Sequence, residues 1–342
     1  MRSSQRPHWS RARARLARWS ILLAVALLAL ASPAAAATWT AVSSPNLTQF
    51  SNVLWGADAL SSSSAWAVGR AETGTLPIHR PVIERWNGSS WSISASPLPP
   101  GGGELRDVDA TSASHAWAVG FSSSSNGNLT LTERWNGSAW SIVPSPSVST
   151  QNHLLGVKSF SATSAWAVGS HNVPGSWAFS TLTMRWNGGA WSVVSSPDTD
   201  SFENHLNAVD GVSANDLWAV GHTRNGEYAV AEPLALHWDG SAWRIVPTPT
   251  ANDATLEGAV ALASDDAWAV GSMFSVAQLW HVPYALHWDG RSWTRVDVPG
   301  PDPPGRPAVR RGRALADEGV RRRPGLGCPL AGAALERQRL DP

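Results

Sequence analysis

Short apolar segments bounded by turn residues recur along the chain every 49 to 52 residues. Each copy contains a Trp-Ala-Val-Gly segment, whose tryptophans are Trp66, Trp117, Trp166, Trp218 and Trp268. A Trp-Asn/Asp-Gly-x-x-Trp segment follows each time, with the pairs Trp86 and Trp91, Trp135 and Trp140, Trp186 and Trp191, Trp238 and Trp243, and Trp288 and Trp293. A leucine precedes the first tryptophan of each copy by twelve residues (Leu54, Leu105, Leu154, Leu206 and Leu256). Self-similarity at such a period is typical of a repeat architecture.

Each repeat is predicted to form four short β-strands, since no 3.6-residue periodicity occurs between residues 38 and 300. In the third repeat they are expected near Leu154–Ser159, Ala165–Val168, Thr181–Trp186 and Trp191–Val194. Asn-Gly or Asp-Gly before the last strand predicts a tight hairpin, because both residues tolerate a positive φ. The pattern therefore predicts an all-β fold, a β-propeller of four-stranded antiparallel blades. Its five complete repeats lie at about 46–96, 97–146, 147–197, 198–249 and 250–299.

The repeat resembles that of kelch-type propellers, the galactose-oxidase type. The segment AWAVG…ERWNGSSWSI follows the kelch order of a glycine-ended strand, an aromatic strand, a turn and a Trp-led outer strand, over residues 39–297. It differs in having one glycine where kelch repeats have two, and tryptophan where they have tyrosine. The Asp-box hairpin of sialidase-type propellers is the rival resemblance, but its leading Ser/Thr is absent and the Asp-to-Gly spacing is one residue shorter.

Residues 1–37 are predicted to be a secretory signal peptide. Six arginines precede an apolar run from Ile21 to Leu30, and four alanines end the segment. Cleavage near Ala36 or Ala37 would release a secreted protein. Ten apolar residues are too few to span about 30 Å of hydrocarbon, so no membrane anchor is expected.

The two ends of the repeat region are unequal. Residues 39–45 resemble an isolated fourth strand, the kind of strand by which propellers close on their last blade. Residues 301–342 are rich in Pro, Arg, Gly and Ala and are expected to be disordered. Read one base later, GC-rich codons for residues 335–341 encode Trp-Asn-Gly-Ser-Ala-Trp, the hairpin of the repeat. We therefore hypothesise a frameshifted sixth repeat and a six- or seven-bladed ancestor. The five remaining blades are expected either to close as about six sectors or to stay open, exposing apolar edges.

Charge and cysteine content narrow the class of partner. Residues 38–300 hold 11 basic and 21 acidic residues, a net charge near −10, which disfavours nucleic acid and anionic membranes as partners. The single cysteine, Cys328, lies in the tail, so no disulfide can stabilise the propeller. One lysine beside 25 arginines indicates a GC-rich genome and a bacterial source. No cofactor is predicted, and the sequence gives no indication of the oligomeric state.

The fifteen framework tryptophans are better explained by packing than by sugar binding. Packing between blades demands strict periodicity, which they keep, whereas a binding face usually varies. The residue before the third-strand tryptophan is Arg in the first three repeats and His237 or His287 in the last two. We interpret both histidines as hydrogen-bonded structural residues, because no further ligands lie at metal-binding spacing.

A binding site is expected on the face formed by the variable loops, those between the second and third strands and those between repeats. Connections of an antiparallel meander alternate between its two ends, so these loops share one face. The candidates are loop aromatics that fall outside the repeat register: Trp177, Tyr228, Trp280 and Tyr284. Asp198, Asp200 and Glu203 are weak candidates for calcium, since the glycine turn and remaining ligands of a calcium loop are missing. No metal site is therefore predicted.

No catalytic residue is predicted. The propeller region lacks the cysteine of kelch-fold copper oxidases and the arginine cluster of sialidases, and it contains no G-x-S-x-G or HExxH motif. The leading hypothesis is an exported binding propeller that recognises a glycan or a protein surface. A two-carboxylate polysaccharide-active enzyme remains an alternative, because paired acids need not be close in sequence. A truncated, non-functional product is the third possibility.

Overall fold

The structure, a computed structural model, describes residues 40–74, 78–226, 229–251 and 253–298. The predicted signal peptide and the tail from residue 301 lie outside the described residues. Secretion, disorder of the tail and the frameshifted sixth repeat therefore stay predictions. The described residues from Ser43 onward belong to one compact unit, and Thr40–Val42 belong to a separate N-terminal unit. None of the described residues forms a helix long and apolar enough to cross a lipid bilayer.

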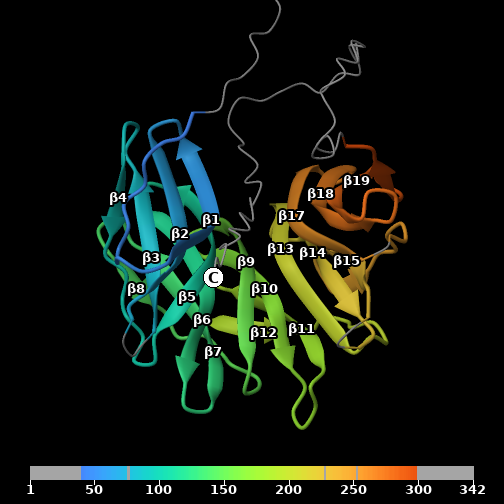
Figure 1. The fold of residues 1–342 in the computed structure, drawn as a ribbon, viewed down its shortest axis with the longest axis horizontal. Helices are drawn as coiled ribbons and strands as arrows, with labels where there is room; N and C mark the ends of the chain where they lie inside the picture. The colour runs from blue at the N-terminus through green and yellow to red at the C-terminus, as the bar shows by residue number, and fades with distance from the viewer. Residues whose placement is uncertain (1–39, 75–77, 227–228, 252, 299–342) are drawn as a thin grey trace, which may run out of the picture. The chain divides into compact units, whose positions relative to one another are not determined.

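The described residues contain twenty strands, four in each repeat (Figure 1). The first blade is β1 (Asn52–Ser61), β2 (Ser64–Glu72), β3 (His79–Trp86) and β4 (Trp91–Ser94). The second is β5 (Gly103–Ser112), β6 (His115–Ser124), β7 (Gly127–Trp135) and β8 (Trp140–Ile142). The third is β9 (Asn152–Ser161), β10 (Ser164–Asn172), β11 (Phe179–Trp186) and β12 (Trp191–Val194). The fourth is β13 (Glu203–Ser213), β14 (Asp216–Arg224), β15 (Ala231–Trp238) and β16 (Trp243–Ile245). The fifth is β17 (Ala254–Ala263), β18 (Asp266–Ser275), β19 (Trp280–Trp288) and β20 (Trp293–Val296).

Each blade is an antiparallel meander whose strands pair in chain order. A single parallel bridge between Phe179 and Glu203 joins the third and fourth blades into one larger sheet. The four strands predicted for the third repeat are all present, and the first three are longer than expected. The predicted fold class, a β-propeller of four-stranded antiparallel blades, is confirmed.

The hydrophobic core lies between consecutive blades. Trp166 of β10 is fully buried, and its ring centroid lies 4.8 Å from that of Trp238 and 5.5 Å from that of Trp243 in the next blade. Leu206, at the start of β13, packs in the same cluster. The same tryptophan triad forms at the other three interfaces. Burying one such ring contributes roughly 4–6 kcal/mol of hydrophobic free energy as an upper bound. The framework tryptophans therefore hold the blades together without disulfides.

The hairpin between the last two strands differs from the expected tight turn. Four residues connect β3 to β4, and only the glycine, Gly88, has a positive φ, of 97°. Asn87 acts instead through its side chain, whose Oδ1 accepts hydrogen bonds from the backbone N–H groups of Ser89 and Ser90, both at 2.9 Å. Asp239 and Asp289 act in the same way in the last two blades. The predicted hairpin is present, but only its glycine uses the positive φ that both turn residues tolerate, because a side-chain oxygen of Asn or Asp stabilises the turn.

The segment before the first blade is not a strand. Residues 40–46 have no regular secondary structure, so the expectation of an isolated fourth strand was wrong for its described part, and Trp39 lies outside the described residues. The segment nevertheless keeps its repeat position. Ser44 Oγ donates to the buried carboxyl of Glu84 in β3 at 2.8 Å, as Ser96 Oγ does to Glu133 in β7 at 3.0 Å. A strand needs a partner edge, and none of the described strands pairs with this segment.

The blades form an open series in the described residues. Each blade packs on the next, and no comparable packing joins the first blade to the fifth within the part of the chain that the structure describes. Of the two expected outcomes, closure into six sectors or an open edge, the described residues adopt the second. Leu54 of β1 is 40% exposed, whereas its four repeat equivalents are fully buried.

Candidate ligand-binding face

The variable loops lie at one end of the blades, which we call the loop face. Its described residues are 73–74, 78, 125–126, 173–178, 225–226, 229–230 and 276–279, together with the described parts of the connections between blades. Backbone hydrogen bonds join neighbouring blades here: Asn128 N donates to Thr150 O at 2.8 Å, and Phe179 N donates to Phe202 O at 3.0 Å. The loop face is therefore anchored by the strands beneath it.

Of the four aromatic candidates, only Trp177 lies exposed in a described loop. Its side chain is 88% exposed between β10 and β11. Tyr228 lies outside the described residues. Trp280 is the first residue of β19 and pairs with Ser275, so its assignment to a loop was wrong. The hairpin of β18 and β19 is paired as far as Ser275 and Trp280, so Trp280 lies in a strand and not in the loop.

Tyr284 is a core residue and not a site residue. It pairs with Gly271, as Leu182 pairs with Gly169 in the third blade, so it is within the repeat register. Its ring is 1% exposed, and its hydroxyl donates to Pro249 O at 3.1 Å. The prediction failed because a tyrosine replaces leucine at this one buried position, and its polar end finds a backbone partner.

The three acids proposed as weak calcium ligands do not converge. Asp198 Oδ1 accepts a hydrogen bond from Thr181 N at 2.7 Å, and Glu203 begins β13 with its Oε2 3.8 Å from His205 Nε2. Asp200 lies in the connection between them. Among the described residues, no three or more His, Cys, Asp or Glu are grouped so that they could hold a metal ion. Asp198 instead orders the connection between two blades.

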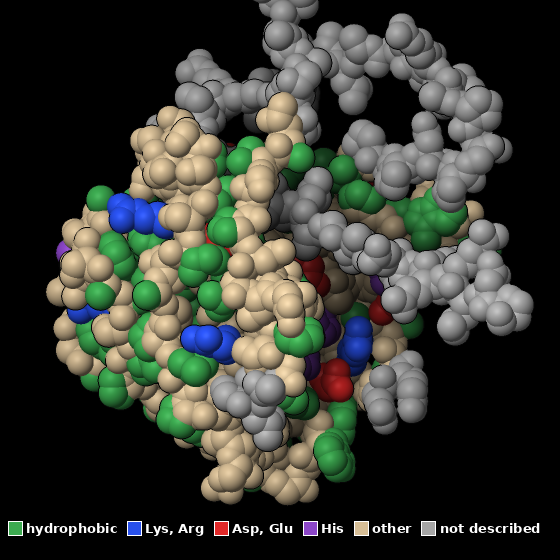
Figure 2. Space-filling view, turned by 60° about the vertical axis from the view of Figure 1, so that its left-hand side comes forward, with side chains coloured by type: hydrophobic (Ala, Val, Ile, Leu, Met, Phe, Trp, Pro, Cys, Tyr) green, Lys and Arg blue, Asp and Glu red, His purple; other side chains and the backbone are tan. Residues whose placement is uncertain are grey.

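A cluster of rings and charged groups lines the start of the inner strands at the loop face. We call it the loop-face cluster; it consists of Trp55, Arg70, Glu104, Arg106, Phe121, His153, Phe179, His205, His222 and Arg224. These side chains come from β1, β2, β5, β6, β9, β11, β13 and β14, and thus from four blades. Figure 2 shows histidine, basic and acidic side chains gathered in a hollow of the surface.

At one end of the cluster, two arginines surround a buried acid. Arg70 Nη1 lies 3.0 Å from Glu104 Oε2, and Arg106 forms an ion pair with the other carboxylate oxygen. The guanidinium carbon of Arg106 lies 4.0 Å from the ring centroid of Trp55. Glu104 is 1% exposed, so its charge is balanced by the two cations and it is held in place. The three side chains and Trp55 form a rigid end to the cluster.

Flat rings continue the cluster across the second, third and fourth blades. Phe121 contacts His153 with ring centroids 4.5 Å apart, and Phe179 contacts His205 at 5.1 Å. His205 and His222 stack at 5.0 Å with an angle of 21° between their planes. This succession presents ring faces and edges over a continuous surface.

The three histidines of the cluster are neutral near pH 7. Burial, together with the smaller effects of His222, His153 and Arg224, lowers the pKa of His205 to about 3. Burial and Arg224 lower the pKa of His222 to about 4, and burial and Arg106 lower that of His153. The Asn128 amide nitrogen lies 2.9 Å from His153 Nε2, which can accept its hydrogen bond only in a neutral imidazole. The cluster therefore offers neutral donors and acceptors, and its positive charge is carried by arginine.

Arg224 is the third arginine of the loop-face cluster. Within the described residues no carboxylate lies within 4.0 Å of it, and its buried Nε has no hydrogen-bond partner. By contrast, Arg70 and Arg106 share Glu104. Arg224 is thus the guanidinium of the cluster best placed to bind an acidic group of a ligand.

Below the cluster, inner-strand carboxylates join neighbouring blades. Asp58 accepts from Ala110 N, Asp109 from Ser159 N and Asp210 from Ala261 N, at 2.8 to 2.9 Å. Lys158 Nζ lies 3.4 Å from Asp109 Oδ1 and 2.8 Å from Asp210 Oδ1. Burial lowers the pKa of Lys158, but the two acids together raise it by more, so the lysine stays charged. These residues hold unpaired strand edges of separate sheets together.

No residue of either inner-strand group was named from the sequence as a candidate site residue. A signal existed for the carboxylates, since Asp58, Asp109 and Asp210 occupy the same repeat position. No such signal existed for the loop-face cluster, whose residue types change from blade to blade. His153 and His205, each preceded by asparagine, are its only repeated element.

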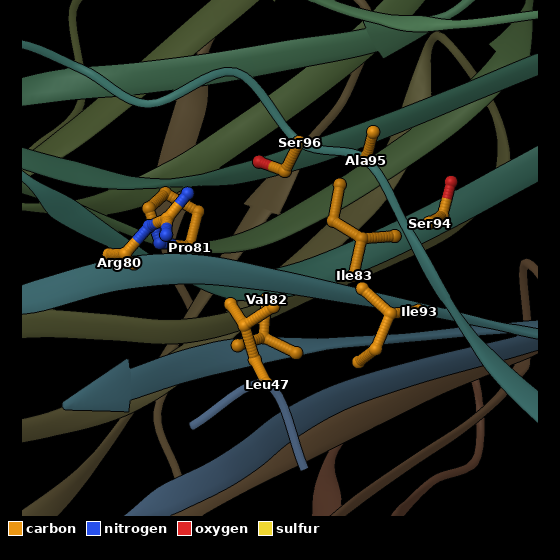
Figure 3. A pocket seen from close by; sticks show the side chains of 9 residues that line it. All are labelled: Leu47, Arg80, Pro81, Val82, Ile83, Ile93, Ser94, Ala95 and Ser96. Atoms are coloured by element: carbon orange, nitrogen blue, oxygen red, sulfur yellow. The ribbon is translucent and has the colours of Figure 1, made fainter. Parts of the chain in front are cut away.

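A shallow pocket of about 350 Å³ lies at the first blade. It is lined by Leu47, Val82 and Ile93 together with Arg80, Pro81, Ile83, Ser94, Ala95 and Ser96 (Figure 3). Its walls are mainly aliphatic, and it contains no carboxylate or imidazole. The pocket therefore lacks groups for catalysis and belongs to the packing surface of the first blade.

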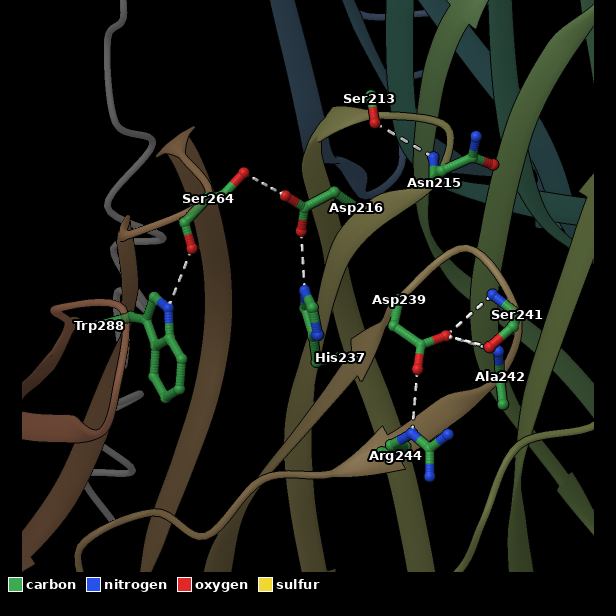
Figure 4. Close-up of polar contacts among 10 residues, drawn as sticks. All are labelled: Ser213, Asn215, Asp216, His237, Asp239, Ser241, Ala242, Arg244, Ser264 and Trp288. Atoms are coloured by element: carbon green, nitrogen blue, oxygen red, sulfur yellow. Dashed lines mark hydrogen bonds and ion pairs between the residues drawn. The ribbon is translucent and has the colours of Figure 1, made fainter.

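The two histidines interpreted as structural lie at the end of the blades opposite the loop face, beside the hairpins that join the last two strands of their blades. His237 Nε2 lies 2.7 Å from Asp216 Oδ1, and His287 Nε2 lies 2.9 Å from Asp266 Oδ1. Asp216 also accepts from Ser264 Oγ of the fifth blade at 2.5 Å (Figure 4). The His237 ring packs at 4.6 Å on Trp218, the place that Arg185 takes over Trp166. The histidines thus replace arginine in the packing between blades.

Comparison with known proteins finds likeness at the level of solved structures. No protein-family model and no curated protein matches the chain. Similar structures include YCF48 from Cyanidioschyzon merolae (16% identity, TM-score 0.40, 68% of this chain and 66% of that chain). They also include YCF48 bound to a D1 peptide (16%, 0.40, 68% and 63%) and an α-L-arabinanase from Cellvibrio cellulosa complexed with arabinohexaose (11%, 0.39, 71% and 95%). The chain thus spans just under two thirds of the YCF48 structures. The similar structures are β-propeller proteins.

Proposed function

We propose that this chain is an exported β-propeller that binds a saccharide chain on its loop face and does not catalyse a reaction. The observation that carries the proposal is the continuous row of phenylalanine and neutral histidine rings from Phe121 to His222. Export is inferred from the leader pattern, and the kelch-type resemblance of the repeat supports a propeller that serves as a scaffold for loops.

The chemistry of the loop-face cluster suits sugars. Aromatic faces pack against the apolar C–H face of a pyranose, and a neutral imidazole can donate one hydrogen bond and accept another. Arg224 adds a guanidinium that can bind a carboxylate or sulfate group on the saccharide. A site with flat apolar rings and a few directed polar groups is the usual form of a small-molecule site.

Trp177 is a second candidate contact, close in sequence to the row. It lies two residues before Phe179, on the loop that connects β10 and β11. An exposed indole costs free energy in water unless a ligand covers it, and its 88% exposure leaves both ring faces free. Trp177 would contact a further sugar unit beyond those held at the cluster.

The experiment is a glycan array followed by titration calorimetry on the best polysaccharide. His205→Ala and Trp177→Ala are each expected to weaken binding about tenfold, the loss of one ring contact of about 1.4 kcal/mol. The matched control is His115→Ala, since His115 bonds to Ser112 and Ser114 at the opposite end of the blade.

The pH dependence of binding gives a second readout. Because the pKa values of His205 and His222 are about 3 and 4, the affinity should stay constant from pH 8 down to pH 5.5. An affinity that rises below pH 6.5 would instead indicate recognition by a charged histidine. Unchanged binding by both alanine variants would contradict the proposed site, and release of sugar products would favour the enzyme alternative.

A further inference from the structure

The first and fifth blades each present an unfilled copy of the inter-blade interface. We call the side of a blade that faces the preceding repeat its leading face, and the opposite side its trailing face. Every internal interface packs a trailing face on a leading face. The first blade has a leading face, and the fifth a trailing face, without a neighbouring blade among the described residues.

The internal interfaces define what each face binds. A trailing face supplies the β-strand tryptophan and valine of the Trp-Ala-Val-Gly segment, such as Trp166 and Val168. A leading face supplies a leucine and two tryptophans, such as Leu206, Trp238 and Trp243. The same pairing occurs four times, with the tryptophan centroids 4.8 to 5.5 Å apart. The two kinds of face are therefore complementary to each other and not to themselves.

Both terminal faces are partly exposed where their equivalents are buried. On the leading face of the first blade, Leu54 is 40% exposed and Trp86 and Trp91 are half-buried. On the trailing face of the fifth blade, Trp268 and Val270 are half-buried. The equivalents of Trp268 are at most 2% exposed, and the equivalents of Val270 are fully buried. The unfilled area is apolar and aromatic on both faces.

Part of the leading face is covered by the chain itself. Ser44 bonds to Glu84, and Leu47 lies with Val82 and Ile93 in the pocket of Figure 3. This segment occupies the place that the Ser96 segment takes on the second blade. Among the described residues, nothing supplies Leu54, Trp86 and Trp91 with the tryptophan and valine that a preceding blade would provide.

The tail of the chain does not carry the missing complement. Residues 299–342 contain no tryptophan and no copy of the Trp-Ala-Val-Gly segment. The residues that fit the leading face occur on trailing faces, and the one trailing face left unfilled is that of the fifth blade. A second copy of the chain therefore offers the matching surface.

We propose that two copies of this chain associate head to tail, with the trailing face of the fifth blade of one copy packed on the leading face of the first blade of the next. The partner is identified by the complement itself: Trp268 and Val270 of one copy enter the space beside Leu54, Trp86 and Trp91 of the other. Such a heterologous contact leaves a free face at each end, so it builds either a closed ring or an open series.

The test measures assembly of the full mature chain by sedimentation velocity over a range of concentrations. The parent is expected to form dimers and larger species as the concentration rises. Leu54→Arg blocks the leading face and Val270→Arg blocks the trailing face, so each variant alone should stay monomeric. An equimolar mixture of the two should form dimers and nothing larger, because one unblocked face of each kind remains.

The matched control is Val193→Arg, since Val193 is 44% exposed on β12 of the middle blade, away from both terminal faces. It should assemble like the parent. Thermal melts confirm that each variant is folded. A parent chain that is monomeric at all concentrations overturns the proposal, and so does self-association of Leu54→Arg. A third outcome also overturns the proposal: the parent is monomeric, and Leu54→Arg lowers its Tm as strongly as a core substitution does. That outcome would show that another part of the same chain covers the leading face.

Discussion

At the scale of single residues, buried carboxyls between blades tune the stability of this protein. Glu133 of β7 is fully buried, and Ser96 Oγ of the preceding blade lies 3.1 and 3.0 Å from its two oxygens. Burial raises the pKa of Glu133 to about 8, and the hydrogen bond from Ser96 offsets only part of that rise. The same position is Met184 in the third blade and leucine in the last two. The neutral carboxyl therefore acts as a polar group in an otherwise apolar interface.

The free energy of unfolding of Glu133→Gln, relative to that of the parent, is expected to increase as the pH rises. The folded pKa of about 8 exceeds the ordinary value of 4.5, so the folded state holds one more proton between these values. The stability contributed by the protonated group is full below pH 4.5 and is lost as pH rises toward 8, by about 1.4 kcal/mol per pH unit. Urea unfolding of both proteins from pH 5 to pH 8 measures the difference. Glu232→Gln, on an exposed glutamate, is the control, and a pH-independent difference for Glu133→Gln would contradict the expectation.

At the scale of strands, one glycine per blade permits the inner strand to bulge against its neighbour. The register of β9 and β10 shifts between Val168 and Gly169, where β9 crosses close to β10. A Cβ on Gly169 would lie 1.9 Å from His153 O, a distance no side chain can take. Its equivalents Gly69, Gly120, Gly221 and Gly271 are crowded in the same way, at 1.8 to 2.0 Å. The glycine of the Trp-Ala-Val-Gly segment is therefore a packing requirement.

Gly169→Ala is expected to destabilise the protein by about 3 kcal/mol or more, because backbone must move to admit the methyl group. Gly258→Ala is the matched control, since its Cβ would meet only Val270 Cγ2 at 3.4 Å, an ordinary contact. Chemical denaturation measures both variants. Equal stability losses for the two substitutions would show that the close approach of β9 does not decide the outcome.

At the scale of the whole molecule, equivalent residues differ because the blade series has two ends. Trp166 is fully buried, whereas Trp268 at the same repeat position is half-buried. The internal interfaces carry the tryptophan triads, and the terminal faces carry incomplete ones. The position within the repeat therefore determines the residue type, and the position of the blade in the series determines how much that residue contributes to the free energy of unfolding.

Trp166→Ala is expected to cost about 3–5 kcal/mol, the usual loss for a buried aromatic residue, and Trp268→Ala clearly less. Both are measured by urea unfolding at low protein concentration, where association does not contribute. Because the two substitutions remove the same side chain from the same motif, each serves as the control for the other. A loss for Trp268→Ala equal to that for Trp166→Ala would mean that its face is fully covered.

Much of the blade could be predicted from the sequence, and most of the candidate site could not. The strands of the third repeat and the hairpin position follow from patterns within about fifty residues, because each blade is built from consecutive chain. Tyr284 was misassigned because its burial follows from its pairing with Gly271. The sequence conceals this repeat position, since tyrosine stands where the three preceding blades have leucine. Trp280 was misassigned because the length of a hairpin depends on how far its two strands pair.

By itself the sequence determined the repeat, the strand order within a blade, the framework tryptophans and the acidic character of the propeller region. These features are periodic or local, so they can be read along the chain. Only the tertiary structure decided that the rings from Phe121 to His222 meet on one face. Only it decided, too, that Leu54 and Trp268 lie on the unfilled faces of the first and fifth blades and are therefore partly exposed. The physical reason is that side chains from different blades come together through packing between sheets, which leaves no spacing pattern when the residue types differ from blade to blade.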